Sequence, residues 1–201
     1  MKQKLTFLTT LLCMLLTLNG AWAQSYYRGE AGLTPQQKKA LERQATEKVQ
    51  TFQKNCELIG EKKDKGAIKT TMDLFADNNR MIQITNLNGS VSNKKVRVYL
   101  NRLSLLGYET IDIESYDCHI ASKFKKSKKM NDLHPDEDWY EAIVSVMQRF
   151  HAVRGDFTYE DVVERNMTVY ARKIQMYRGG GKQDTWIIQL GDITAKTVSV
   201  N

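Results

Sequence analysis

Apolar residues recur every three or four positions in the first long stretch of regular pattern. This stripe consists of Leu41, Ala45, Val49, Phe52, Cys56 and Ile59. Such spacing places every member on one face of a helix of about 25 residues. Thr34 precedes Pro35, and Gln37 can complete a capping box, so the helix is predicted to begin there.

Two shorter helices and one short strand are predicted next. Ile68, Met72 and Phe75 indicate a helix near 66–77, and Met81 to Ile84 a short strand. Asn86 to Ser90 has the composition of a turn. A further helix is predicted over about 93–106, with one apolar face made of Val96, Tyr99, Leu100, Leu103 and Leu106. Gly107 is well placed to end it.

After Gly107 the pattern changes to partial alternation, rich in Ile, Tyr and Thr. Four long strands are predicted, over residues 108–124, 139–153, 162–177 and 185–200. The loops between them span 125–138, 154–161 and 178–184, which favours an antiparallel meander. The whole order predicts an α+β fold: N-terminal helices packed on a strongly curved antiparallel sheet of four long strands plus one short strand.

The first 23 residues have a composition of their own. Lys2 and Lys4 precede an apolar stretch that ends at Leu18, and Ala21-Trp22-Ala23 is a small-x-small sequence. This pattern predicts a secretory signal peptide over residues 1–23, cleaved between Ala23 and Gln24. The apolar core is shorter than the roughly 20 residues of a spanning helix, which disfavours a membrane anchor. We therefore expect an exported protein, periplasmic or secreted, with a tether at 24–33 and a single domain at 34–201.

Composition limits the function classes. Removing the leader leaves 201 − 23 = 178 residues with 28 basic and 23 acidic side chains, a net charge of +5. Export and so small an excess disfavour a nucleic-acid partner. No other segment is apolar enough to span a membrane. Gly179 to Lys182 lacks the spacing of a phosphate-binding loop, and no cofactor is expected.

The mature chain keeps two cysteines, Cys56 and Cys118. In an exported protein they could form one disulfide. The alternative is two buried thiols that act as small apolar groups. Sequence spacing leaves both open.

Four segments together resemble the nuclear transport factor 2-like superfamily, which has a cone-shaped, cystatin-like fold. They are LERQATEKVQTFQKNCELI, MDLFADNNRMIQI, VRVYLNRLSLLGY and WIIQLGDITAKTVSV. The resemblance covers about residues 34–200 and concerns architecture. It implies a pocket between the sheet and the helices, which in this superfamily is an active site, a ligand cavity or a packed core.

The resemblance implies that pocket acids, tyrosines or histidines would serve as acid–base groups. The candidates are Asp112, Glu114, His119 and His151. Asp112 and Glu114 share one face of a predicted strand, so they could transfer protons if that face lined the cavity. The alternative is a solvated face, with Ile111 and Ile113 packed against the helices.

Four large amphipathic side chains are candidates for lining such a pocket: Tyr99, Tyr116, Tyr170 and Trp186. They would give an apolar cavity with a few hydroxyl or indole donors. If the cone is closed, the same residues fill the core.

The loop at 125–138 carries lysines first and carboxylates afterwards. Asp132, Asp136 and Asp138 could offer oxygen ligands to calcium. However, the sixth position from Asp132 holds Glu137 instead of glycine, and the twelfth holds Ile143. We therefore predict a charged, solvated loop and no metal site.

These observations favour an exported, non-catalytic module of a bacterial cell envelope that binds a small apolar ligand or a protein partner. A homodimer through the sheet face is an additional expectation from the resemblance. The alternative is a small pocket enzyme of isomerase, dehydratase or hydrolase type, with a cavity carboxylate or histidine.

Overall fold

The computed structural model describes residues 33–85, 90–178 and 180–200, in two compact units. The first unit is Met1–Lys38, and its described residues form the start of the first described helix. There the Thr34 N–H donates to Gln37 Oε1 at 2.8 Å, and the Gln37 N–H donates to Thr34 Oγ1 at 3.2 Å. This reciprocal pair is the predicted capping box. The second unit is Lys39–Asn201.

The described helices are α2 (Pro35–Lys62), α3 (Lys65–Met72), α4 (Val96–Leu105) and α5 (Lys128–Leu133). Within the described ranges, none of the helices is long and apolar enough to cross a membrane. Helix α3 ends earlier than predicted, because Leu74 to Ala76 leave the helix to pair with Leu190. Helix α5 lies in the segment predicted as a loop, where the Ser127 hydroxyl caps it by accepting from the Met130 N–H at 3.4 Å.

Over the described residues the sheet has seven strands, not the five that the sequence predicted. They are β1 (Met81–Thr85), β2 (Val91–Lys95), β3 (Thr110–Ile120), β4 (Lys125–Lys126), β5 (Trp139–Arg154), β6 (Phe157–Arg178) and β7 (Gly181–Val200). Strand β2 takes the residues expected to begin the third helix, so α4 starts at Val96. Most of the expected turn after β1, residues 86–89, lies outside the described residues.

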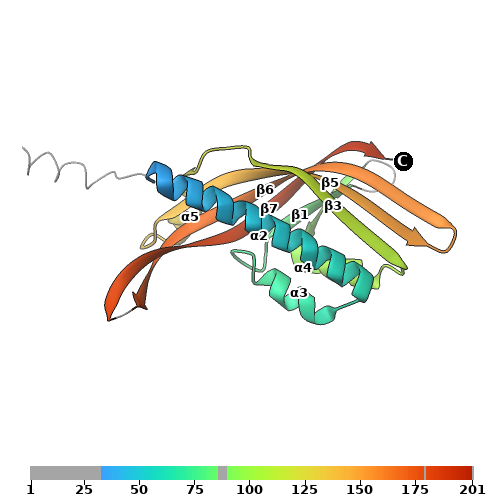
Figure 1. The fold of residues 1–201 in the computed structure, drawn as a ribbon, viewed down its shortest axis with the longest axis horizontal. Helices are drawn as coiled ribbons and strands as arrows, with labels where there is room; N and C mark the ends of the chain where they lie inside the picture. The colour runs from blue at the N-terminus through green and yellow to red at the C-terminus, as the bar shows by residue number, and fades with distance from the viewer. Residues whose placement is uncertain (1–32, 86–89, 179, 201) are drawn as a thin grey trace, which may run out of the picture. The chain divides into compact units, whose positions relative to one another are not determined.

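The strand order is β2-β1-β7-β6-β5-β3, with β4 paired to β5. Every pairing is antiparallel except that of β1 with β7, which is parallel and has one partner pair, Ile82 with Ile193. The β5–β6 hairpin turns at Gly155, whose φ of 57° suits glycine, so β6 begins before its predicted start. The resulting sheet is strongly curved (Figure 1).

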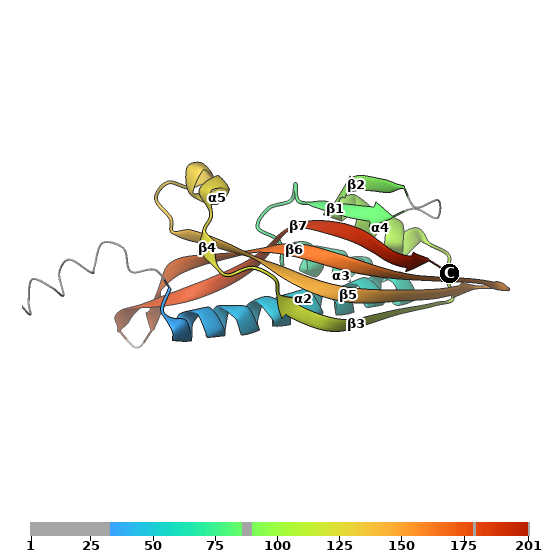
Figure 2. The same cartoon turned by 90° about the horizontal axis from the view of Figure 1, so that it is seen from above.

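Helix α2 lies along one face of the sheet, here called the inner face (Figure 2). Its predicted stripe is confirmed, because all six apolar members are buried. The inner faces of β5 and β6 meet this stripe with Val144, Val146, Val163 and Met167. Gly60 lets α2 approach β3 closely, since a Cβ there would overlap the Ile111 side chain.

A smaller cluster covers the opposite, outer face at one end. Met130 of α5, Trp139 and Tyr170 pack together there. The Arg80 guanidinium lies 4.9 Å from the centre of the Tyr170 ring and pairs with Asp77 at 2.8 Å. Arg80 is only 3% exposed, so its charge is held by this carboxylate and by the aromatic face. The cluster ties the loop before β1 to the sheet.

Candidate functional site

A pocket of about 320 Å³ lies between α4 and the turn end of the β5–β6 hairpin. Helix α4 contributes Tyr99, Arg102 and Leu103, and the chain beyond it contributes Leu106 and Tyr108. The remaining wall consists of Ile84, Thr85, Phe157 and Tyr159. Aliphatic and aromatic groups therefore form most of the surface. Arg102 is the one charged residue among the described residues that line it.

Two tyrosines of the pocket wall, Tyr108 and Tyr159, pack against one phenylalanine ring outside the lining. The Phe150 ring packs edge-on against Tyr108 at 6.3 Å and against Tyr159 at 6.0 Å, measured between ring centres. Phe150 itself comes from the inner face of β5, opposite Asp161 of β6. The cross-strand packing fixes the orientation of both tyrosines.

A carboxylate lies beside one of these tyrosines. The Tyr159 hydroxyl donates to Asp161 Oδ2 at 3.0 Å. Burial raises the pKa of the Asp161 carboxyl, while the hydrogen bond from Tyr159 and the charge of Arg165 oppose that rise. Burial also raises the pKa of Tyr159, and the neighbouring Asp161 raises it further. The tyrosine is therefore a neutral hydroxyl at physiological pH.

Tyr99 lies within electrostatic reach of the same groups. Burial raises the pKa of its hydroxyl, Cys56 and Asp161 raise it further, and Arg165 lowers it. Cys56 is itself buried, and burial raises the pKa of its thiol to about 12. Such a thiol stays protonated and unreactive, so it serves as a small core group.

Arg165 supplies the positive charge of this corner. Its Nε donates to Gln148 Oε1, and its Nη1 donates to the Gln83 carbonyl at 3.3 Å. These bonds come from β5 and β1, and Gln148 is buried, so the guanidinium is held on the inner face of β6. A fixed cation near the pocket favours negative charge on a bound molecule.

The predicted acid–base candidates lie elsewhere. Asp112 and Glu114 are exposed on the outer face of β3, whereas Ile111 and Ile113 point to the inner face. This arrangement is the solvated face given as the alternative. His119 is also exposed, with Nδ1 3.3 Å from Asp117 Oδ1. 

His151 likewise lies on the outer face, where its Nδ1 is 3.5 Å from Glu160 Oε2. None of the four predicted acid–base groups lines the pocket beside α4 or the groove between α2 and β7.

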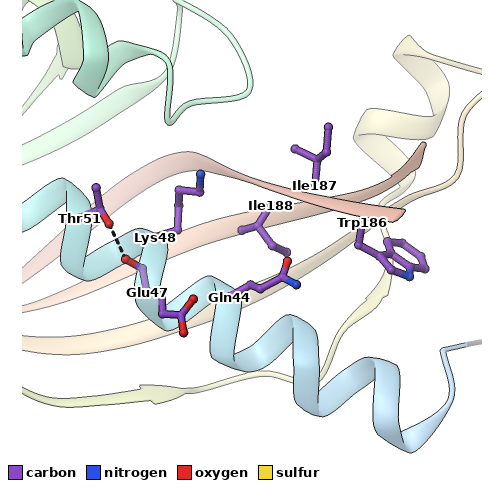
Figure 3. A pocket seen from close by; sticks show the side chains of 7 residues that line it. All are labelled: Gln44, Glu47, Lys48, Thr51, Trp186, Ile187 and Ile188. Atoms are coloured by element: carbon purple, nitrogen blue, oxygen red, sulfur yellow. Dashed lines mark hydrogen bonds between the residues drawn. The ribbon is translucent and has the colours of Figure 1, made fainter. Parts of the chain in front are cut away.

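The four predicted pocket side chains separate in the structure. Tyr99 lines the pocket described above. Trp186 lines a different groove, of about 400 Å³, between α2 and β7 (Figure 3). Tyr170 is buried in the outer cluster, and Tyr116 is 43% exposed on the outer face. The prediction that Tyr170 and Tyr116 line the pocket was therefore wrong.

The two cysteines are free thiols in the structure. Cys118 interacts with the Thr46 side chain, and Cys56 lies ten residues further along α2. Ten helical residues span about 15 Å, which is far beyond disulfide range. The two cysteines are therefore separate thiols, of which Cys56 is buried as the alternative expected and Cys118 is only half-buried.

The carboxylates of the 125–138 segment do not form a metal site in the structure. Over the described ranges, no three His, Cys, Asp or Glu side chains gather closely enough to hold a metal ion. Asp138 instead lies 3.6 Å from Lys126 Nζ. Asp132 and Asp136 are exposed.

Sequence reasoning missed Asp161, Tyr159 and Arg165. The available signal was period-two spacing, which places these three residues on one face with the apolar Val163 and Met167. Two polar residues among core positions of one strand indicate a functional or strongly bonded site.

No protein-family model matches the chain, and no curated protein matches it. Among solved structures, a type 2 hexachlorocyclohexane dehydrochlorinase (LinA) is similar, at 11% identity and a TM-score of 0.42. The match covers 81% of this chain and 91% of that one.

Proposed function

We propose that the protein is an exported member of the nuclear transport factor 2-like superfamily that binds a small amphipathic molecule. The ligand has an apolar or aromatic body and one anionic group, and it occupies the pocket between α4 and the β5–β6 hairpin. The composition of the pocket wall supports this proposal most strongly. Leucine, isoleucine and aromatic rings surround a volume at the lower end of the range for ligand pockets.

The charges near the pocket favour an anionic head group. Arg102 is exposed in the last turn of α4, where it can meet a carboxylate or sulfonate at the pocket mouth. Arg165 adds a second positive charge behind the wall. Asp161 opposes them, but burial raises its pKa and so disfavours its charged form. A cationic ligand would be repelled by the positive charges of Arg102 and Arg165.

A pair of related dyes tests this proposal. The anionic dye 1-anilinonaphthalene-8-sulfonate and the neutral N-phenyl-1-naphthylamine share the same aromatic rings. Both should bind the folded protein. Arg102→Gln should weaken binding of the anionic dye about 10- to 100-fold, as expected for losing a charged hydrogen bond of about 1.5–3 kcal/mol. Binding of the neutral dye should change less than about twofold.

Arg97→Gln is the matched control. Arg97 lies on the same helix, is exposed, and bonds to Asn78 Oδ1 at 3.3 Å outside the pocket. This variant should leave both affinities unchanged. Tyr99→Trp should weaken both dyes, because the larger ring occupies the pocket. The proposal would be contradicted if neither dye bound the folded protein. It would also be contradicted if Arg102→Gln and Arg97→Gln weakened binding of the anionic dye equally.

A small pocket enzyme is the second candidate, and the Tyr159–Asp161 contact is the observation that favours it. A ligand carbonyl could accept the hydrogen bond of the Tyr159 hydroxyl, which would leave the Asp161 carboxylate free to remove an adjacent proton. The probe is octan-2-one in D₂O. An enzyme of this type should accelerate deuterium exchange beside the carbonyl, and Asp161→Asn should abolish the acceleration. If the unchanged protein exchanged deuterium no faster than Asp161→Asn does, the enzyme candidate would be excluded.

Export is proposed from the sequence of residues 1–23 alone. The basic start, the apolar stretch and the small-x-small ending support it. Sequencing of the mature amino terminus is the direct test.

A further inference from the structure

The first half of β7 has one edge that no other described strand covers. Strand β1 pairs with β7 only at Ile193. Before that point, the segment Leu74 to Ala76 pairs with Leu190: the Leu190 N–H donates to the Leu74 carbonyl, and the Ala76 N–H donates to the Leu190 carbonyl. From Ile188 back to Gly181, β6 is the one strand partner in the described chain.

The register tells which main-chain groups point toward this open edge. The N–H and C=O of one strand residue point to the same side, and the next residue points to the other. Leu190 uses both groups away from β6, and the β6–β7 register is regular from Leu190 to Gly181. The edge groups are therefore those of Ile188, Trp186, Asp184 and Lys182. The odd-numbered residues between them bond to β6.

A groove runs beside this edge. Side chains of Trp186 and Ile188 form one wall, and the α2 side chains form the other (Figure 3): Gln44, Glu47, Lys48 and Thr51. The Trp186 ring packs edge-on against the Tyr140 ring, with ring centres 5.6 Å apart. A strand added to the edge would place every second side chain over this groove.

The hairpin that carries this edge also extends past the rest of the sheet. The last β5 partner on β6 is Arg172, so β6 and β7 continue beyond it as a two-stranded ribbon (Figure 1). Ribbons of two strands gain stability from a third. The tip exposes Tyr177 at 76% and Met176 at 40%.

Charge favours one kind of occupant. Residues 172–188 contain four basic side chains and one acidic side chain, 4 − 1 = +3. Lys173 already pairs with Asp184 and Arg172 with Glu137, so the excess positive charge of this segment belongs to Arg178 and Lys182. On the helix wall Lys48 lies beside Glu47, whose charge is offset by its pairing with Arg43. We propose that the open edge of β7 and its groove bind an extended acidic peptide segment of a partner protein, added as a strand beside Lys182 to Ile188.

Amide hydrogen exchange followed by NMR tests this placement residue by residue. In the free protein, the amides of Asp184, Trp186 and Ile188 should exchange quickly, whereas Thr185 and Ile187 should be protected by β6. An eight-residue peptide of alternating valine and glutamate should protect the fast set at least about tenfold. A valine–lysine peptide of the same length should protect it much less.

A proline variant separates edge pairing from hairpin stability. Asp184→Pro removes an edge N–H while sparing the bonds to β6, so the fold should persist. It should weaken binding of the valine–glutamate peptide by about tenfold or more. Asp184→Asn keeps the N–H and removes a negative charge, so it should bind the valine–glutamate peptide at least as tightly as the unchanged protein does.

Three outcomes would overturn the proposal. Slow exchange of the Asp184, Trp186 and Ile188 amides in the free monomer would show that the edge is already covered. Equal binding of the valine–glutamate and valine–lysine peptides would show that the edge does not prefer an acidic partner. Protection that rises with protein concentration alone would assign the edge to a second copy of this chain.

Discussion

Phe52→Ala tests whether α2 is held to the sheet through the packing seen in the structure. Phe52 is 2% exposed, and its ring lies edge-on to Phe75 with centres 5.5 Å apart. Phe75 precedes the residue that bonds to Leu190, so this pair links α2 to the segment that ends the open edge of β7. Truncation should therefore loosen both the core and the groove wall.

The magnitude follows from burial. An aromatic side chain buries about 150–250 Å², worth roughly 4–6 kcal/mol at about 25 cal/mol per Å². Alanine retains a small part of this, and the edge-on ring contact adds about 0.5–1.5 kcal/mol. Measured phenylalanine-to-alanine losses of about 3–5 kcal/mol agree with this sum. We expect a loss of about 4 kcal/mol for Phe52→Ala.

Urea unfolding followed by circular dichroism is the measurement. With a slope of about 2 kcal/mol per molar urea, the midpoint should fall by about 2 M. Gln50→Ala, at an exposed position of the same helix, should shift the free energy of unfolding by less than about 0.5 kcal/mol. A loss below about 1 kcal/mol for Phe52→Ala would refute the packing of α2 on the sheet.

Three further predictions concern other parts of the chain. Burial raises the pKa of Asp161 above its ordinary 3.8, so ionisation costs stability as the pH rises through that pKa. Asp161→Asn should therefore be more stable than the unchanged protein at pH 7, and urea titrations should show this advantage shrinking toward pH 4; a constant difference contradicts the cause. Gly191→Ala should lower the free energy of unfolding by about 1–3 kcal/mol in the same assay, because its Cβ would lie 2.6 Å from Tyr170 Cε2. An unchanged free energy of unfolding would mean that the Tyr170 ring moves aside without cost. Sequencing of the exported protein should begin at Gln24, and a chain that begins at Met1 would disprove cleavage.

The sequence predicted features that depend on neighbours within one element. The stripe of α2 follows from a period of 3.6 residues, and the cap at Thr34 follows from side-chain bonds over three residues. Alternation likewise separates the buried Ile111 from the exposed Asp112 and Glu114. Each of these patterns is local, so composition and spacing were sufficient to read it.

Pairing between elements was harder to predict. The short strands β2 and β4 have too few residues for a clear period, and their existence depends on partners in β1 and β5. The predicted start of β6 was too late. The hairpin turn before it consists of only two residues, the first of which is Gly155, and so short a turn leaves a weak signal in the sequence. Tyr170 is on the outer face by simple alternation from the inward-facing Met167, because the register shift near Val169 lies in β7 and leaves the β5–β6 register unbroken. The sequence shows this alternation but does not show which face of β6 the helices cover.

The sequence by itself determined the amphipathic helices, the series of long strands and the division of β3 into an apolar and a polar face. Only the tertiary structure decided that Tyr99, Arg102 and Tyr159 share a pocket, and that the β7 edge at Trp186 stays open. The physical reason is the range of the interactions. Helix and strand periods are set by each residue's own backbone, whereas a pocket or a free edge depends on register and contacts between segments far apart in the chain.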